Sequence, residues 1–515
     1  MAWSHIVFVG FLNVAFAFAQ LAQRKNVLML IADDYRPNMG VYEDANDPFF
    51  NSPKMVTPNL DALASRSLVA TRAYCQVAFC GPSRNSFLTG RRADTTRVYN
   101  LNYTFRDLGP NNEASPIVTI PQFFKENGYI SLAIGKVFHS ANHDDPISWT
   151  EDSYWPDDTD DDSQSWKAFT GEEIEDIGGL QDQMSATYAM EKLQELAPGA
   201  LLGVQPFFLA FGVRKPHLPW DFPEEFLEYY PEEDIQMPAN PYIPSDMPDS
   251  AWGGFRPLTS YPDCSPEGTG IEDIGQPNVT FSEPKIKELR RAYYASVSYA
   301  DQQIGRVLQE LNLLGLAENT IIVFLGDHGY QLGEHSEWEK TTNFEIAHRA
   351  PLMLHVPGVI DSFIESDKLV EFVDIFPSLV EAAGFGTMAK CPDYSRNVSF
   401  CREGSSLLDL VRDPEIWKNS IFYQQPQGYF SDALYDDYQG YAIMTDQYRY
   451  TEWVGLNNGG QEEQSPNWSD SKDFGELYDL VNDPLENTNL IYNENYQDII
   501  AELSEVLHQG WSAHN

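Results

Sequence analysis

The sequence predicts an α/β fold, a sandwich with a mostly parallel central sheet and a smaller C-terminal α+β domain with an antiparallel sheet. Over the first four hundred residues, apolar runs of strand length alternate with segments of helical spacing, and polar residues follow the strands directly. After Arg412 this alternation weakens and short β-like segments take over. We therefore expect a large domain over residues 20–412 and a smaller one over residues 413–515, in a chain long enough to bury a sizeable core.

The strands of the large domain are predicted from unbroken apolar runs, which are typical of parallel strands buried on both faces. They are expected at Asn26–Ala32, Tyr129–Ile134, Phe207–Val213 and Thr320–Leu325. Because ligands of open α/β sheets bind beyond the carboxyl ends of the strands, the polar residues that follow each run are candidate site residues.

The helices between these strands are predicted from their boundary residues. Thr57 and Pro58 form an N-cap with proline at the first helical position. A second helix is expected at Pro121–Asn127, and a long one at Lys285–Leu314 ends before Gly315.

The C-terminal domain is predicted from short β-like segments and one amphipathic stretch. The strands are expected at Ser420–Gln425, Tyr441–Met444, Tyr448–Val454 and Glu476–Leu480, and a closing helix at Tyr496–Gln509. The segment Gly455–Ser471 is polar and rich in Gly, Asn and Gln, so we expect a long surface loop there.

The first nineteen residues resemble a secretory signal peptide. An apolar run over Ile6–Ala19 ends in Ala17-Phe18-Ala19, a small-x-small cleavage pattern before Gln20. A membrane anchor, the alternative, needs about 20 apolar residues, and this run is shorter. No later stretch qualifies as a membrane span either. We therefore expect a protein of the secretory pathway, lysosomal or extracellular, without a membrane partner.

Cysteines and glycosylation sequons fit such a compartment. Of five cysteines, Cys391 and Cys401 enclose a short segment and are expected to form a disulfide, whereas a Cys75–Cys264 pair is an alternative that the sequence leaves open. N-x-S/T sequons, which are acceptors of surface glycans, occur at Asn102, Asn278, Asn397 and Asn467.

The charge balance excludes some partners. With 33 basic against 77 acidic residues, the formal net charge is −44, so nucleic acid is an improbable partner. The acidic run Asp157–Asp162 is interpreted as a solvated loop rather than a calcium site. An anionic substrate would depend on local cationic groups, because charges are screened over about 8–10 Å at physiological salt.

The most informative motif is Cys80-Gly81-Pro82-Ser83-Arg84, which continues to Leu88-Thr89-Gly90. It resembles the C-x-P-S-R…LTG signature of the sulfatase family; the alternative is an ordinary buried cysteine in a loop. The resemblance implies that a formylglycine-generating enzyme oxidises Cys80 during export. It also implies that Arg84 later holds the new side chain. The aldehyde hydrate would be the nucleophile, and its second hydroxyl would allow sulfate to be expelled.

The resemblance extends over residues 26–489 and implies an alkaline-phosphatase/sulfatase-like sandwich. It is carried by further stretches at residues 85–97, 135–139, 215–219, 332–340, 401–404 and 448–454. It implies one bound Ca²⁺, with Asp33, Asp34, Cys80, Asp327 and His328 as its ligands. A histidine nitrogen is less typical of calcium than oxygen is.

The same resemblance assigns the sulfate and the proton transfers to basic residues, because a sulfate ester stays anionic throughout the reaction. The implied catalytic residues are Cys80, Arg84, Lys136, His139, His217 and Lys340. His139 would deprotonate the hydrate, and His217 with Lys340 would assist departure of the sugar oxygen. Taken singly, Lys136, His139, His217 and Lys340 would each more often be an exposed charge or a satisfied histidine.

The expected activity is removal of 2-O-sulfate from a sulfated uronic acid during glycosaminoglycan breakdown. Loops that depart from the family pattern, such as the acidic region Asp144–Asp176, make the chemistry a firmer expectation than the sugar. The alternatives are a sulfatase for another sulfated polysaccharide, a catalytically silent glycan-binding or matrix protein, and a phosphonate or phosphodiester hydrolase.

Overall fold

The computed structural model describes residues 24–43, 52–107, 114–139, 144–254, 256–427, 438–455, 466 and 468–513. The predicted signal peptide, residues 1–19, lies outside the described residues, as do Asn467 and most of the predicted loop at Gly455–Ser471. None of the helices in the described part of the chain combines the length and the apolar character that a membrane span needs.

A seven-stranded sheet forms the centre of the molecule. Its order is β12 (Ile364–Ser366), β2 (Leu68–Ala70), β11 (Leu352–His355), β8 (Thr320–Gly326), β1 (Asn26–Ala32), β6 (Phe207–Val213) and β4 (Ile130–Gly135). The neighbours β8, β1, β6 and β4 run parallel, whereas β11 is antiparallel to β8 and β2. The predicted mostly parallel sheet is therefore confirmed.

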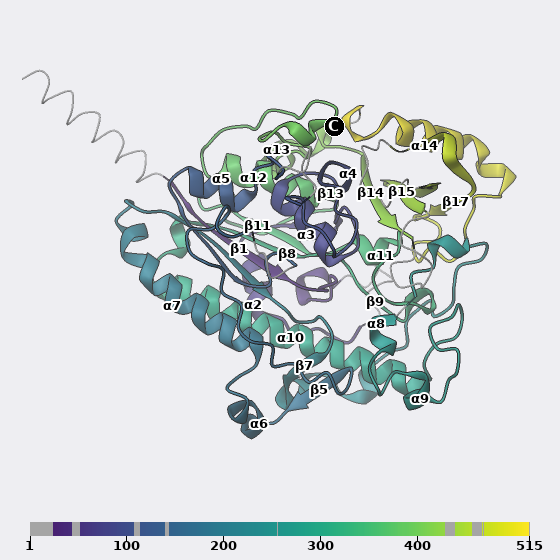
Figure 1. Ribbon diagram of the computed structural model, residues 1–515, viewed down its shortest axis with the longest axis horizontal. Helices are drawn as coiled ribbons and strands as arrows, with labels where there is room; N and C mark the ends of the chain where they lie inside the picture. Colours follow the sequence, from purple (N-terminus) through teal and green to yellow (C-terminus); the bar gives the residue numbers. More distant parts are fainter. Residues whose placement is uncertain are drawn as a thin grey trace, which may run out of the picture.

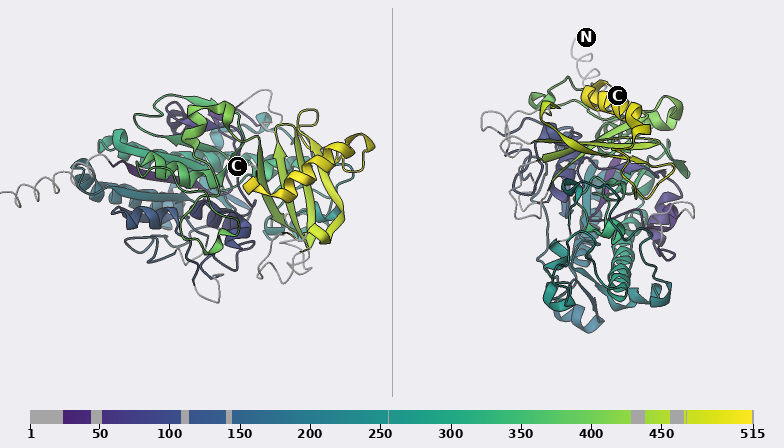
Figure 2. Two further views of the ribbon diagram at one scale, coloured as in Figure 1. Left: turned by 90° about the horizontal axis from the view of Figure 1, so that it is seen from above. Right: turned by 90° about the vertical axis from the view of Figure 1, so that its right-hand side faces the viewer.

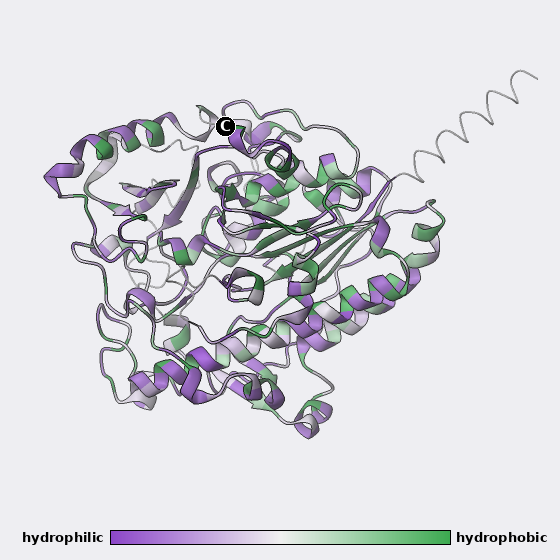
Figure 3. Ribbon diagram, turned by 180° about the vertical axis from the view of Figure 1, so that it is seen from behind, coloured by the Kyte–Doolittle hydropathy of each residue, from purple (hydrophilic) through white to green (hydrophobic). Residues whose placement is uncertain are grey.

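Helices cover both faces of this sheet, as Figure 1 shows. Alternate residues of β1 enter separate cores: Leu28 and Leu30 lie in one, Val27 and Met29 in the other. The first core includes α7 (Gln181–Leu201) and α10 (Glu283–Leu313), and the second includes α3 (Cys80–Thr89), α5 (Ile120–Glu126), α12 (Ile375–Ala382) and α13 (Leu407–Arg412). Burial on both faces explains why these strands are unbroken apolar runs, and Figure 3 shows the central strands as the most hydrophobic layer.

The predicted C-terminal antiparallel sheet is also present. Its strands are β14 (Ser420–Pro426), β15 (Tyr438–Thr445), β16 (Tyr448–Gly455) and β17 (Ser471–Asp479), in sequence order. The closing helix α14 (Gln497–Gln509) packs on one face of it (Figure 2). Ala442 and Met444 of the other face pack with Tyr74 and Leu369 of the preceding part of the chain.

Short elements complete the described structure. The helices are α2 (Pro58–Ala64), α4 (Ala93–Thr96), α6 (Gly171–Asp176), α8 (Arg256–Thr259), α9 (Pro266–Thr269) and α11 (Glu345–His348). The strands are β3 (Ala73–Tyr74), β5 (Trp166–Phe169), β7 (Trp220–Pro223), β9 (Gln331–Leu332), β10 (Trp338–Glu339) and β13 (Val370–Glu371). Thr57 stands at the predicted N-cap position with Pro58 at the start of α2, but its side chain makes no capping hydrogen bond.

One expected disulfide forms and the open alternative does not. Cys391 and Cys401 are bridged, with their Cα atoms 4.9 Å apart. Cys75 and Cys264 are buried free thiols. They belong to the cores on opposite faces of the central sheet, so the two thiols cannot pair.

Candidate active site

Two parallel strands bring the predicted acidic residues together. β1 and β8 are hydrogen-bonded neighbours whose last residues, Ala32 and Gly326, lie side by side. The residues that follow them, Asp33-Asp34 and Asp327-His328, therefore share one edge of the sheet. Asp34 adopts a left-handed backbone conformation, with φ at 58°, and its N–H donates to Asp327 Oδ1 at 3.0 Å.

Helix α3 places Cys80 at the same edge of the sheet. Cys80 is the first residue of that helix, and its Sγ lies 3.3 Å from His328 Nε2 and 3.8 Å from Asp34 Oδ1. One ligand atom each from Asp33, Asp34, Cys80 and His328 lies within 4.8 Å of the other three, and all four residues are buried.

This group fits a divalent cation. Two carboxylates and one imidazole converge, and the Sγ of Cys80 marks where oxygen atoms would stand if the side chain were oxidised. His328 Nδ1 lies 2.7 Å from the Gly329 carbonyl oxygen, which fixes the tautomer that leaves Nε2 as the electron-pair donor. Asp327, the fifth predicted ligand, lies beside the group, with its Oδ1 3.6 Å from His328 Nε2.

Three buried cations neutralise these carboxylates. Arg84 donates from Nε to Asp327 at 2.9 Å and from a terminal nitrogen to Asp33 at 3.1 Å. Lys136 pairs with Asp33, and Lys340 Nζ lies 2.5 Å from Asp34 Oδ1. Such pairing is what allows buried charges to persist.

These charges also set the protonation states. Burial alone would raise the pKa of Asp33, but the charges of Lys136 and Arg84 outweigh it and hold that pKa well below its usual range. Burial raises the pKa of the Cys80 thiol well above its ordinary value, and the charge of Asp33 adds to the effect. An unmodified Cys80 is therefore a neutral thiol and a poor nucleophile.

The two predicted histidines are neutral. Burial, helped by the charge of Lys136, lowers the pKa of His139 to about 3, and the same two causes lower the pKa of His217 well below its ordinary value. His139 lies beside the start of α3, where its Cβ is 3.8 Å from the position that a Cβ on Gly81 would occupy. His217 Nδ1 lies 2.5 Å from the Leu218 carbonyl oxygen.

A buried ion-pair cluster that sequence reasoning missed connects the loops that carry the site. Glu334 Oε1 accepts from Arg36 at 3.0 Å and from Arg290 at 3.1 Å, and its other oxygen accepts from the Leu332 N–H. Arg36 follows Asp33-Asp34 closely, and Glu334 begins the segment that leads to Lys340. Each residue is a common charge by itself, and nothing in the sequence pairs them.

The acidic run Asp157–Asp162, interpreted from the sequence as a solvated loop, is only partly exposed to solvent. The side chain of Asp160 is only 3% exposed and contacts Arg214 and Lys215, which follow strand β6 directly. Asp158 is exposed and pairs with Arg214. The interpretation is wrong for Asp160, because the two cations beside the predicted catalytic His217 draw this carboxylate inward.

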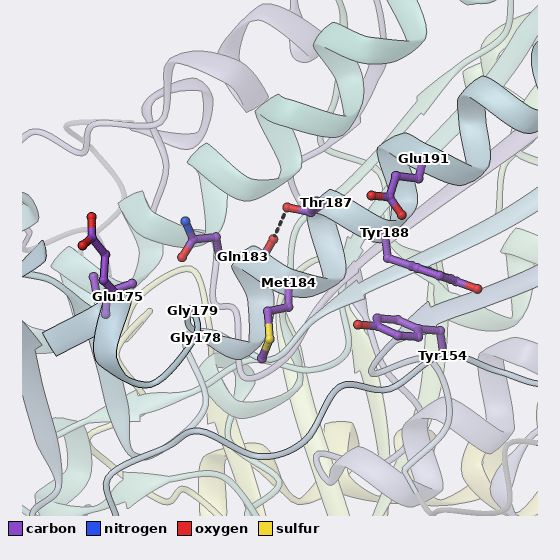
Figure 4. A pocket seen from close by; sticks show the side chains of 10 residues that line it. Tyr154, Glu175, Gly178, Gly179, Gln183, Met184, Thr187, Tyr188 and Glu191 are labelled. Atoms are coloured by element: carbon purple, nitrogen blue, oxygen red, sulfur yellow. Dashed lines mark hydrogen bonds between the residues drawn. The ribbon is translucent and has the colours of Figure 1, made fainter. Parts of the chain in front are cut away.

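A hollow of about 530 Å³ lies outside this site, along the first turns of α7 (Figure 4). Tyr154 and Tyr188 stack there with ring centroids 3.8 Å apart. It is lined by Tyr154, Ile174, Glu175, Gly178, Gly179, Gln183, Met184, Thr187, Tyr188 and Glu191. None of the predicted catalytic or metal-binding residues belongs to this lining.

Comparison with known proteins agrees with this geometry. The sulfatase family model matches residues 25–385, and the model of the N-sulphoglucosamine sulphohydrolase C-terminal region matches residues 333–512. The chain is 37% identical to iduronate 2-sulfatase of Mus musculus and 37% identical to that of Homo sapiens, in each case over 91% of this chain and 91% of the relative.

A solved structure supports the fold. A protein in complex with its substrate D-glucosamine-2-N,6-O-disulfate superposes with a TM-score of 0.68 at 19% identity, covering 95% of this chain and 98% of its own. The family match spans more than half of the chain, and the iduronate 2-sulfatases span nearly all of it. This chain belongs to the sulfatase family and is a sulfatase.

Proposed function

We propose that this sulfatase removes the 2-O-sulfate of a sulfated uronic acid during glycosaminoglycan breakdown, with Cys80 converted to formylglycine and one Ca²⁺ bound. The observation that carries the proposal is the position of Cys80 Sγ, among three metal-ligand side chains and beside three buried cations. The substrate class is supported by the 37% identity to two iduronate 2-sulfatases.

Asp33, Asp34, Asp327 and His328 would hold the ion, together with the oxidised side chain at position 80. The bound ion would supply positive charge that polarises a sulfate oxygen, and the formylglycine hydrate would supply the nucleophilic hydroxyl. Histidine is a less usual ligand of calcium than of softer ions, but the carboxylates make up most of this donor set and favour a hard cation.

The basic residues of the chain would bind the sulfate and move the protons. Arg84, Lys136 and Lys340 place fixed positive charge where the ester stays anionic, at a site shielded from water. Local neutralisation of this kind explains how a protein with a net charge of −44 can take an anionic substrate.

The proton transfers are assigned to three side chains. His139, neutral because its pKa is about 3, would accept the proton of the second hydroxyl. Burial tends to lower the pKa of Lys340, but the charge of Asp34 raises it well above its ordinary value, so Lys340 carries a proton. With His217 beside it, Lys340 would protonate the departing sugar oxygen.

The cellular setting is part of the proposal. The signal-like segment at residues 1–19 and the Cys391–Cys401 disulfide support a secretory-pathway protein, lysosomal or extracellular. Export would also expose Cys80 to the formylglycine-generating enzyme. The described sequon residues Asn102, Asn278 and Asn397 are exposed and accessible to glycosylation. We also propose the division into residues 20–412 and 413–515.

A substrate panel tests the proposal. Sulfate release is measured from uronate-2-sulfate and hexosamine-sulfate oligosaccharides of defined structure, and the peptide that contains position 80 is analysed by mass spectrometry. We expect selective release from the uronate-2-sulfate and a peptide mass that fits formylglycine. Preferred release from hexosamine sulfates would contradict the sugar assignment, and an entirely unmodified thiol in active enzyme would contradict the mechanism.

Removing the ion is expected to abolish turnover without unfolding the chain. Enzyme dialysed against a chelator should lose sulfate release and regain it with Ca²⁺, while its far-UV circular dichroism stays unchanged. Asp34→Asn should need a higher Ca²⁺ concentration for half-maximal activity, because it removes one ligand charge. Full activity after complete chelation, verified by elemental analysis, would contradict the metal site.

A further inference from the structure

The cations near the site differ in how far they are exposed. The side chains of Lys136 and Lys340 are only 6% and 5% exposed, and each is paired with a carboxylate at the proposed metal site. Arg214 is 18% exposed and has no contact with those carboxylates. It is nevertheless close to the site, because the N–H of the predicted catalytic His217 donates to the Arg214 carbonyl oxygen at 2.9 Å.

Arg214 is held by two different carboxylates. Its Nε lies 3.1 Å from Asp160 Oδ2, and Asp160 in turn binds Lys215 Nζ at 2.9 Å. Its terminal nitrogen lies 2.6 Å from Asp158 Oδ2. Asp160 is only 3% exposed, so it fixes the orientation of the guanidinium, whereas Asp158 is 56% exposed.

Of these two ion pairs, the one between Arg214 and Asp158 is the one that a ligand could replace. Exposed ion pairs contribute little net stability, because water and salt compete with them. A guanidinium binds carboxylates through a planar array of N–H donors, and one edge can be filled by a ligand while Nε stays bound to the protein. Asp158 therefore shows in the structure where a carboxylate binds to the outer edge of Arg214.

We propose that Arg214 is a specificity-determining residue that binds the carboxylate of the uronic acid, and that Asp158 occupies this position until the substrate displaces it. This inference rests on the proposed function, since a uronic acid carries both a scissile sulfate and a carboxylate. A substrate without the carboxylate cannot take the place of Asp158 on Arg214, and it gains no binding free energy at this position. Arg214 therefore selects between sulfate esters, and the buried cations serve all of them.

The test compares two substrates across variants of Arg214. We expect Arg214→Gln to lower kcat/KM for uronate-2-sulfate about 10- to 100-fold more than for the same sugar with its carboxyl group reduced to an alcohol, as for loss of a hydrogen bond to a charged group. Arg214→Lys, which keeps the charge without the planar donors, should give an intermediate loss. Because any effect through His217 acts on both substrates, the ratio isolates the carboxylate contact.

Two neighbouring aspartates provide a matched pair. Asp158→Asn removes the competing carboxylate and should lower KM for the uronate about two- to five-fold at low salt. Asp157→Asn removes the same charge one residue earlier, from an exposed side chain without an ion pair in the described part of the chain, and should leave KM unchanged. Thermal melting curves of all variants verify that each is folded.

The outcomes separate this inference from the proposed function. An equal loss on both substrates for Arg214→Gln, or no loss on either, would overturn the role of Arg214 and leave the function standing. If the wild-type enzyme hydrolysed aryl sulfates but no uronate-2-sulfate, the proposed substrate would fall, and this role with it.

Discussion

Cys80→Ala is expected to abolish sulfate release, with a loss of at least about 10⁴-fold in kcat, the scale seen when an enzyme loses its nucleophile. Alanine cannot be oxidised to an aldehyde, and in the folded protein no other described cysteine lies among the metal-ligand side chains. Steady-state sulfate release from an aryl sulfate and from a uronate-2-sulfate measures the loss.

The fold should survive this substitution. Cys80 is buried at the start of α3, but alanine suits a helix and removes only one sulfur atom. Cys264→Ala is the matched control, because that thiol is equally buried but belongs to the core on the α7 and α10 face. The control should keep full activity. Undiminished turnover in Cys80→Ala, at an unchanged melting temperature, would refute the proposed nucleophile.

Much of the central sheet could be predicted from the sequence because its strands are buried on both faces. The apolar run at Asn26–Ala32 coincides with β1, and that at Phe207–Val213 coincides with β6. The short strands β2 and β12 have only three residues each, too few to form a recognisable apolar run. β11 was missed for a related reason: its four residues are too few to distinguish from a turn of buried helix.

Helix α3 could not be predicted from periodicity. All ten of its residues are buried, including Ser83, Arg84 and Asn85, so no apolar stripe distinguishes an inner from an outer face. Its polar side chains are buried because they bond to neighbouring segments: Ser83 Oγ donates to the Asp327 carbonyl oxygen, and Asn85 Oδ1 accepts from the Phe105 N–H. In this helix, polar residues that serve the candidate site occupy buried positions that are apolar in an ordinary helix.

The candidate site itself was expected from a family resemblance, and the structure adds contacts that no spacing in the sequence contains. Residues Asp33 and Asp327 lie almost three hundred positions apart, and only the β1–β8 register brings them together. The pairs of Glu334 with Arg36 and Arg290, and of Arg214 with Asp158 and Asp160, are likewise long-range. A single sequence gives no means to choose partners among so many charged residues.

The second large effect that we expect comes from breaking the buried ion-pair cluster of Glu334 with Arg36 and Arg290. We expect Glu334→Gln to lower the free energy of unfolding by about 3–5 kcal/mol, because it leaves the buried cations Arg36 and Arg290 without their shared carboxylate. It should also lower kcat, because Glu334 connects the loop after β1 to the segment that carries Lys340. Urea unfolding at pH 7 measures the first effect, and sulfate release measures the second.

The pH dependence gives this prediction its sharpest test. Burial alone would raise the pKa of Glu334, but the charges of Arg36 and Arg290 lower it to about 2. Since this pKa lies below its unfolded value near 4.5, the ionised carboxylate stabilises the fold fully above pH 4.5 and progressively less as the pH falls toward 2. The stability gap between wild type and Glu334→Gln should therefore be constant from pH 7 to 5 and narrow below it.

Glu337→Gln is the matched control three residues along the same segment. Glu337 is also fully buried, but burial raises its pKa well above the ordinary value, so its carboxyl group is neutral in the folded protein. Glutamine has nearly the same shape as this neutral acid and keeps an oxygen to accept from the Gly253 N–H, so the cost should stay within about 1 kcal/mol. If Glu334→Gln and Glu337→Gln lowered the free energy of unfolding equally, the ion-pair cluster would contribute nothing to stability beyond what a buried amide provides.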